Sequence, residues 1–261
     1  MPLDKLQQSI IQEDPWTKLQ SFTQARIALG RAGVSIPLQE NLQFRLAHAH
    51  ARDAVYSGLA LDNLATSLQA LRLPVLQLHC QCANRQVYLQ GPDLGRRLNA
   101  ASNELLKQLS PTNPDIAIVL ADGLSATAIN ENALPLLQIL IPVLKSQYFS
   151  VAPICIVEQA RVAIADEIGS LLQAKLSIIF IGERPGLSSP NSMGAYITYN
   201  PSVGLTDESR NCISNIRPEG LPYQFAAEKI LYLIKQSLRL KLSGVGLKDE
   251  SGSFGELSNL F

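Results

Sequence analysis

Apolar positions in the first 72 residues recur at the spacing of α-helices. Apolar side chains repeat at intervals of two to three residues from Trp16 to Leu29, and Gly30 follows as a residue that can end a helix. Similar patterns predict a second helix over Gln39–Ser57 and a third over Leu61–Leu71. Residues 1–72 are therefore predicted to form a small N-terminal helical domain.

From residue 73 the pattern changes to short, nearly continuous apolar runs that alternate with helical segments. The runs predict strands at Pro74–His79, Asp115–Leu120, Val151–Val157, Leu176–Ile181 and Ala195–Tyr199. The helical segments are Leu94–Leu109, Ser125–Gln147, Arg161–Leu172 and Tyr223–Leu242. Such alternation indicates a mostly parallel sheet covered on both faces, so residues 73–247 are predicted to form a doubly wound, Rossmann-like α/β domain. Residues 248–261, polar and rich in Gly and Ser, predict a disordered tail.

Composition narrows the classes of function. The 261 residues carry 22 basic and 22 acidic side chains, and a nucleic-acid-binding protein would normally show a basic excess. No apolar run reaches the roughly 18 residues of a membrane span, and no secretory signal is visible. The four cysteines lack zinc-site spacing, which favours reduced thiols in a cytoplasmic protein. The low charge also predicts an apolar surface that a partner covers, and hence aggregation of the isolated chain.

Polar segments follow three of the predicted strands. They are residues 121–125, 158–162 and 182–186, the last reading Gly-Glu-Arg-Pro-Gly. Ligands of doubly wound sheets bind outside the carboxyl ends of the strands, so these exits predict a ligand-binding edge. Pro185 and the two flanking glycines further predict a rigid shelf there, with close backbone approach to a ligand.

The sequence offers no catalytic machinery of its own. Gly244-Val245-Gly246 follows a helix, lacks a third glycine and is typical of a helix end, not of dinucleotide binding. No G-x-S-x-G segment is present. His48 and His50 are two residues apart and so face different sides of a helix. A self-sufficient α/β enzyme would need a nucleophile or metal site that this sequence does not display.

Six segments, in order along the chain, together resemble one family. They are residues 22–33 (FTQARIALGRAG), 88–98 (YLQGPDLGRRL), 122–125 (DGLS), 182–187 (GERPGL), 211–216 (NCISNI) and 243–244 (SG). With these segments the chain resembles the small (light) subunit of ethanolamine ammonia-lyase from about Trp16 to Lys248. A non-enzymatic α/β adaptor or interaction protein with this fold is the alternative.

The resemblance implies an adenosylcobalamin-dependent lyase that converts ethanolamine to acetaldehyde and ammonia. It implies that a TIM-barrel large subunit carries the substrate site, that the small subunit closes over the cobalamin at the interface, and that six large and six small subunits assemble. The expected location is the cytoplasm. Some family members have longer N-terminal segments that act as encapsulation signals, so packaging in a bacterial microcompartment is left open.

Three cobalamin contacts are implied by matching the family's motifs residue by residue: Val162, Glu183 and Cys212. Each has a structural alternative. Val162 could be plain core packing, Glu183 could form an ion pair with Arg184, and Cys212 could be a small buried hydrophobe. The implied catalytic set on this chain is empty.

Weaker candidates surround these three. Asn211, Asn215 and Arg217 are candidates for contacts with the corrin side chains or with the large subunit. Arg31, Arg96 and Arg97 are candidate interface anchors, because arginine is enriched at interfaces, although a solvated face is nearly as good an explanation.

Overall fold

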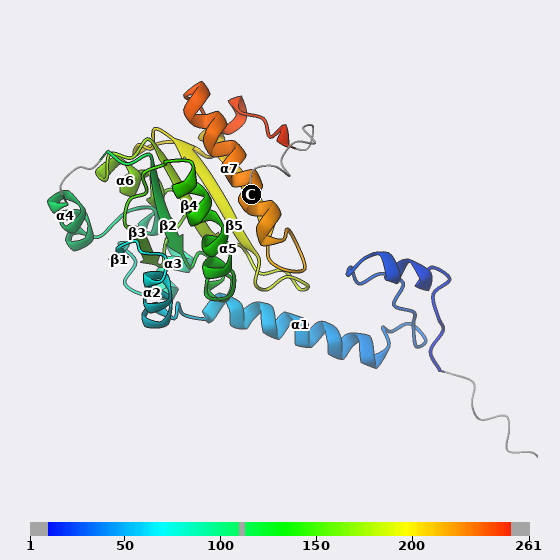
Figure 1. The fold of residues 1–261 in the computed structure, drawn as a ribbon. Coiled ribbons are helices and arrows are strands. Elements are labelled where there is room, and N and C mark those ends of the chain that lie inside the picture. The colour runs from blue at the N-terminus through cyan, green and yellow to red at the C-terminus, as the bar shows by residue number, and fades with distance from the viewer. Residues whose placement is uncertain (1–9, 110–112, 252–261) are drawn as a thin grey trace, which may run out of the picture.

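A computed structural model describes residues 10–109 and 113–251, and it contains a six-stranded sheet (Figure 1). The strands are β1 (Val75–His79), β2 (Ile116–Ala121), β3 (Ile154–Glu158), β4 (Leu176–Gly182), β5 (Met193–Tyr199) and β6 (Arg210–Ile216). Their order across the sheet is β1-β3-β2-β4-β5-β6. The first four strands in this order run parallel, and β5 and β6 pair antiparallel.

Helices cover both faces of the sheet, as predicted. The covering helices are α2 (Leu61–Gln69), α3 (Arg85–Gln90), α4 (Ala100–Gln108), α5 (Ala126–Ser146), α6 (Ile164–Leu171) and α7 (Tyr223–Leu240). Helix α1 (Leu38–Tyr56) precedes them and projects away from the sheet (Figure 1). Short 3-10 helices are η2 (Thr17–Phe22), η3 (Leu94–Arg96), η4 (Asp207–Ser209) and η5 (Gly244–Gly246). The core residues place α2, α5 and α7 on one face and α3, α4 and α6 on the other.

Two hydrophobic cores follow from the alternation of side chains along the strands. Ile118 and Phe180 point to the face that α5 and α7 cover, where Leu136 packs against them. Val119 and Ile179 point to the opposite face, under α3, α4 and α6. All six residues of β2 are buried, which explains why its sequence is continuously apolar instead of alternating.

The α/β class and the mostly parallel sheet are confirmed, while the Rossmann-like detail is not. Rossmann folds follow the strand order 3-2-1-4-5-6. Here β1 lies at the edge and β3 lies between β1 and β2. The two antiparallel strands β5 and β6 extend the sheet beyond β4.

Helix α5 is long and apolar enough to cross a membrane by length and composition. In the structure it packs across the sheet and against α7, and ten of its 21 residues are buried. Ser125 caps its N-terminus by accepting a hydrogen bond from the N–H of Ala128. The apolar composition of α5 is thus accounted for by its place in the core.

The N-terminal prediction is correct in part. Helices α1 and α2 form as predicted, and Leu64 and Leu68 of α2 belong to the first core of the sheet. The helix predicted over residues 16–29 is wrong, because only Thr17–Phe22 is helical, as a 3-10 turn. A short helix gains most of its stability from burying one face, and the side chains of residues 16–26 are all exposed. The domain boundary at residues 72 and 73 stays a prediction.

Three further differences concern the second half of the chain. The helix predicted over residues 94–109 is divided into η3 and α4 by an extended segment that ends at the N-cap residue Asn99. Strand β6 is not among the predicted strands, because four of its seven residues are polar and it has no apolar run. The predicted tail lies mostly outside the described residues, and within them Asp249 accepts a hydrogen bond from Lys229 at 2.7 Å.

Candidate functional site

The three polar strand exits meet at one edge of the sheet, at the carboxyl ends of β2, β3 and β4. The N–H of Leu124 donates to the carbonyl of Gly182 at 2.9 Å. The N–H of Ala160 donates to Oδ1 of Asp122 at 3.2 Å. The prediction that these exits share one edge is confirmed, and hydrogen bonds hold each exit against another.

Two glycines allow this close meeting of backbones. A Cβ at Gly182 would lie 2.0 Å from the carbonyl oxygen of Ser125. Gly123 has a φ of +52°, and a Cβ there would lie 2.3 Å from the carbonyl oxygen of Gly182. The predicted close backbone approach at Gly182 is therefore real, but the neighbour is the chain's own β2 exit.

A buried ion pair lies beneath the edge, and sequence reasoning missed it. Arg85 Nη1 lies 3.3 Å from Oδ2 of Asp122, whose side chain is 2% exposed. Burial raises the pKa of Asp122 to about 6, and the backbone N–H of Gln159 and the charge of Arg85 act against that rise. Arg85 also donates to the carbonyls of Gly123 at 2.8 Å and Val55 at 2.7 Å. The pair therefore fastens the β2 exit to the end of α1.

On the face of the sheet that carries α3, α4 and α6, these helices leave part of β5 and β6 uncovered. Tyr196 on β5 is half-buried, and its neighbour across the strands, Cys212 on β6, is exposed. Helix α6 reaches only as far as Arg210, whose buried guanidinium forms an ion pair with Asp166. Ser214, two residues beyond Cys212, is exposed as well. We call the sheet surface formed by Tyr196, Cys212 and Ser214 the open face; Gly194, two residues before Tyr196 on β5, is buried.

Glu183 leaves β4 and lies over one end of the open face. A Cβ at Gly194 would lie 2.9 Å from its Oε1, so the carboxylate rests on the bare backbone of β5. Its Oε2 accepts hydrogen bonds from the hydroxyl of Ser192 and from the N–H of Asn215, the latter at 3.2 Å. In the described chain the Glu183 carboxylate is thus held by a hydroxyl and a backbone N–H, and the side chain of Arg184 is exposed.

A bulge in β6 supplies the N–H that binds Glu183. The register between β5 and β6 shifts between Met193 and Ala195, and Asn215 adopts a φ of +61°. Asparagine tolerates this left-handed conformation better than most residues. Its Oδ1 accepts a hydrogen bond from Nε of Arg217 at 2.9 Å. Asn215 and Arg217 therefore support Glu183 from within the chain.

Asn211, the third of the weaker candidates on β6, has a structural task. Its side-chain nitrogen donates to the carbonyls of Gly244 at 3.2 Å and Leu247 at 2.8 Å. Its Oδ1 accepts from the N–H of Gly244 at 2.8 Å. These bonds fix η5 against the sheet and occupy the amide.

Cys212 is exposed, so the alternative of a small buried hydrophobe is wrong. Its sulfur lies 3.4 Å from the hydroxyl of Ser214. Burial raises the pKa of Tyr196, and the neighbouring Cys212 and Glu183 raise it further. Tyr196 therefore lies within electrostatic reach of both predicted residues, and it stays a neutral phenol at physiological pH.

Val162 is half-buried where the β3 exit enters α6, and it packs against the same core as Tyr196. It lines a cavity of about 790 Å³ between that exit, η3 and the segment before η4. The charged lining residues are Asp93, Arg96, Arg97, Arg161, Asp207 and Arg210. Arg161 is fixed by its donation to the carbonyl of Tyr88 at 3.1 Å and by stacking on that ring.

The structure thus brings Glu183 and Cys212 together around Tyr196 and places Val162 on the same face of the sheet, in the adjoining cavity. No sequence signal marks Tyr196, Ser192 or Gly194, because a strand residue's face is known only once the pairing is known. Among residues 10–109 and 113–251 no group of His, Cys, Asp and Glu side chains is suited to hold a metal ion.

Comparison with known proteins decides the family. The family model described as ethanolamine ammonia-lyase light chain matches residues 13–248. The chain belongs to this family.

Curated relatives agree closely with that assignment. The ethanolamine ammonia-lyase small subunit of Pseudomonas putida (strain W619) is 52% identical over 244 residues, which cover 92% of this chain and 89% of the relative. That of Azotobacter vinelandii (strain DJ / ATCC BAA-1303) is 52% identical over 242 residues, covering 92% and 90%. That of Pseudomonas syringae pv. tomato (strain ATCC BAA-871 / DC3000) is 49% identical over 255 residues, covering 96% and 88%.

Membership of the ethanolamine ammonia-lyase light chain family accounts for the chemistry of the site. The open face presents a carboxylate, a thiol and hydroxyls, which can bind a ligand. The chain is a subunit of a lyase whose activity depends on the complex. A light chain implies a heavier partner, and this favours the lyase subunit over a non-enzymatic adaptor.

Proposed function

We propose that this light chain, together with the large subunit, forms an adenosylcobalamin-dependent ethanolamine ammonia-lyase, and that its open face covers the cofactor at the subunit interface. The main support is that the family assignment and the geometry of the sheet agree. A chain 52% identical to a curated small subunit leaves one strip of its sheet uncovered, and of the predicted contacts Cys212 lies on that strip and Glu183 at its end.

The residues present fit a cobalamin. The corrin is a broad, flat ring with amide groups on its rim, and it needs a shallow surface with hydrogen-bond acceptors at the border. Cys212 and Ser214, which are exposed, have small side chains, so the open face is shallow. Glu183 stands at its end, and two donors fix the carboxylate through Oε2. Of the roughly four acceptor positions of a carboxylate, those on Oε1 are then suited to amide N–H groups.

Each of the three residues would hold the cofactor in a different way. Glu183 would accept hydrogen bonds from rim amides, Cys212 would contact the ring through its exposed sulfur, and Val162 would contact it from the cavity beside α6. When bound, the cofactor supplies the radical chemistry, and the large subunit supplies the substrate site. The light chain would bind the cofactor, orient it and shield it from water.

The remaining parts of the proposal concern assembly and location. We place the complex in the cytoplasm as six large and six small subunits. A further part of the proposal is packaging within a bacterial microcompartment.

The test replaces Glu183 in the full chain co-purified with its large subunit. A charge-assisted hydrogen bond contributes about 1.5–3 kcal/mol, so Glu183→Ala should weaken adenosylcobalamin binding about tenfold to a hundredfold. Glu183→Gln keeps one acceptor and should weaken it less. The matched control is Glu104→Ala, because Glu104 is an exposed carboxylate on α4 that pairs with Lys107 at 2.8 Å.

Binding is measured by equilibrium dialysis against the cofactor, and assembly by light scattering. All variants should assemble. If Glu183→Ala binds the cofactor as tightly as Glu104→Ala, Glu183 serves only the loop. If the wild-type complex neither binds adenosylcobalamin nor deaminates ethanolamine, the proposed function itself is wrong.

A further inference from the structure

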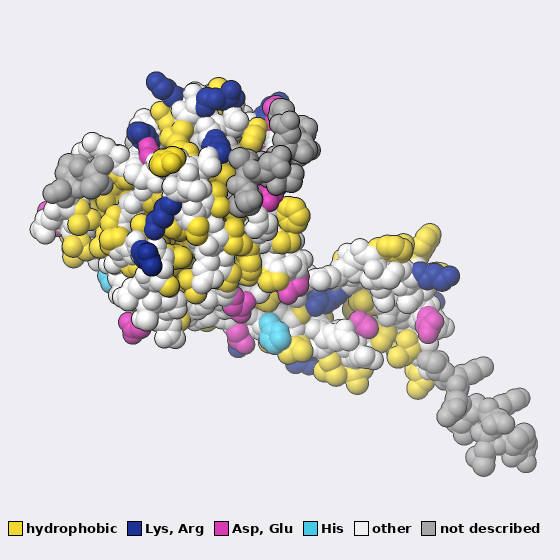
Figure 2. All heavy atoms as spheres, viewed as in Figure 1, with side chains coloured by type: hydrophobic (Ala, Val, Ile, Leu, Met, Phe, Trp, Pro, Cys, Tyr) yellow, Lys and Arg dark blue, Asp and Glu magenta, His cyan; other side chains and the backbone are white. Residues whose placement is uncertain are grey.

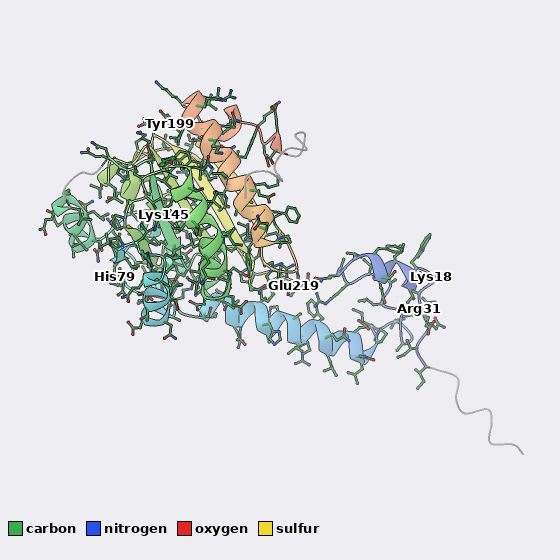
Figure 3. All side chains as sticks on the ribbon, viewed as in Figure 1. Lys18, Arg31, His79, Lys145, Tyr199 and Glu219 are labelled. Atoms are coloured by element: carbon green, nitrogen blue, oxygen red, sulfur yellow. The ribbon has the colours of Figure 1, made fainter. Side chains whose placement is uncertain are left out.

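The N-terminal part of the chain, residues 10–56, projects from the α/β body as an arm (Figure 1). Helix α1 has 19 residues and therefore a length of about 28 Å. Of the residues before Ala54 that the structure describes, only Pro37 is buried. Figure 3 shows Lys18 and Arg31 at the far end of α1 from the sheet, so this end lies well away from both cores.

The arm has a defined shape although it lacks a core. Gln12 and Arg31 exchange two backbone hydrogen bonds of 2.8 and 2.9 Å. Gly30, with a φ of +72°, turns the chain there, and a Cβ would lie 2.6 Å from the carbonyl oxygen of Gln12. The side-chain nitrogen of Gln20 donates to the carbonyls of Ile27 at 3.0 Å and Ala28 at 3.1 Å. Exposed hydrogen bonds of this kind add little net stability, so they specify a shape more than they stabilise it.

The arm also exposes most of the large apolar side chains on the described surface. Twelve of the twenty that are exposed lie in residues 10–56, which is less than a fifth of the described chain. Of these twelve, the most exposed are Ile10, Phe22, Val34 and Leu38. Figure 2 shows hydrophobic side chains on the projecting part among charged ones of both signs. Such a concentration marks an interaction surface that recognises an apolar partner.

A groove runs from the arm toward the candidate site. It has a volume of about 620 Å³ and is lined by residues of the arm, including Leu29, Ile36 and Phe44, together with Leu187 and Ser188. Leu187 lies four residues after Glu183, in the loop that leaves β4. Arg26 of the arm donates to the Leu187 carbonyl at 3.5 Å. Ser188 in turn accepts a hydrogen bond from Arg217 at 3.5 Å, and Arg217 donates to Asn215, whose N–H binds Glu183. The wall of the groove is therefore joined by hydrogen bonds to the supports of Glu183 at the open face.

We infer that the arm is the segment that docks onto the large subunit, with its apolar side chains and the groove buried there. This inference rests on the proposed function, because it takes the large subunit as the partner that shares the open face. Continuity of the groove with the Glu183 loop favours this partner over a second copy of the light chain. A stable interface of this kind buries about 800 Å² on each partner, and an exposed helix of about 28 Å with its apolar N-terminal segment offers a surface of that order.

The test uses matched substitutions at equally apolar, exposed positions of the full chain, each co-purified with the large subunit. Val34→Asp lies in the arm, where Val34 is fully exposed, and Val245→Asp lies on η5 of the body, where Val245 is 79% exposed. Phe22→Asp in the arm is paired with Phe225→Asp on α7. Affinity for the large subunit is measured by interferometry, and circular dichroism checks that each chain is folded.

The arm variants should lose at least tenfold in affinity for the large subunit, and the body variants should keep wild-type affinity. In the wild-type complex, hydrogen exchange of α1 should slow on assembly. Equal affinities for arm and body variants, or unchanged exchange in α1, would overturn the inference. Light scattering of the light chain alone tests the other occupant, since dimers that dissociate on Val34→Asp would assign the arm to a second copy. A wild-type chain that binds no large subunit would instead overturn the proposed function.

Discussion

The α/β body and the N-terminal arm differ in where their apolar side chains lie. The body buries its apolar side chains between a sheet and helices on both faces, with β2 and β4 buried along their whole lengths. The arm has the same kinds of apolar residues, but in the described part of it only Pro37 and Ala54 are buried. The body can fold on its own interior, whereas the arm has a shape whose stabilisation must come from outside the chain.

This difference predicts where substitutions will harm the isolated chain. Phe180→Ala, in the first core, should lower the free energy of unfolding by about 3–5 kcal/mol, because it leaves a cavity between the sheet and α5. Phe22→Ala, at an 85% exposed position of the arm, should change it by less than about 0.5 kcal/mol. Denaturant unfolding of both variants measures the contrast. A comparable loss for Phe22→Ala would mean that the arm is packed against the body after all.

A second prediction compares two glycines. Gly182→Ala should destabilise the chain by about 3 kcal/mol, since its Cβ would lie 2.0 Å from a backbone oxygen that cannot rotate away. A Cβ added at Gly58, just after α1, would meet nothing within 4 Å, so Gly58→Ala should be neutral or slightly stabilising. Thermal unfolding of the two variants decides it, and equal melting temperatures would contradict the close meeting of the β2 and β4 exits.

How much could be predicted from the sequence follows the same division. Helices α5 and α7 and the buried strands are predictable because local pattern and burial agree there. The helix expected over residues 16–29 is wrong, because apolar spacing is informative only where a neighbouring element buries the apolar face. Strand β6 escapes prediction because Cys212 and Ser214 face outward without a cover, so the strand lacks an apolar run.

The candidate site divides in a similar way. Family motifs locate Val162, Glu183 and Cys212, and the strand exits locate the edge. The supports of Glu183 could not be found in advance, because Ser192 and Asn215 reach it only through a bulge in the pairing of β5 with β6. Arg85 lies 37 residues from Asp122 along the chain, so no local pattern links them.

A third prediction uses the buried charge of the body. The pKa of Asp122 is raised to about 6, so between pH 4 and 6 the folded chain holds a proton that the unfolded chain has lost. The stability that this proton confers is present at low pH and is lost as the pH rises through 6. The loss is up to about 3 kcal/mol, and Asp122→Asn, which cannot ionise, should not show it.

The measurement is the free energy of unfolding of the wild type and of Asp122→Asn from pH 4 to pH 7. The wild type should lose stability relative to Asp122→Asn over this range. Asp53→Asn is the control, since Asp53 is an exposed carboxylate on α1 and its replacement removes no buried charge. Parallel curves for the wild type and Asp122→Asn would show that the Arg85 pair fully compensates for the burial of Asp122.

The smallest effect on stability is expected at Cys212, a residue of the body that does not share the burial of its neighbours. This thiol belongs to the body but is exposed like a residue of the arm, so Cys212→Ser should change the free energy of unfolding by less than about 0.5 kcal/mol.

The rate at which the Cys212 thiol is alkylated should report whether the open face is covered. Cys80, Cys82 and Cys155 are buried and burial raises the pKa of each thiol, so an alkylating reagent should react first with Cys212 in the isolated chain. In the complex loaded with adenosylcobalamin, alkylation of Cys212 should be at least tenfold slower than in the isolated chain. Mass spectrometry of the labelled peptide measures both rates. An alkylation rate that is the same in the isolated chain and in the loaded complex would mean that the open face stays open, and would remove Cys212 from the proposed cofactor surface.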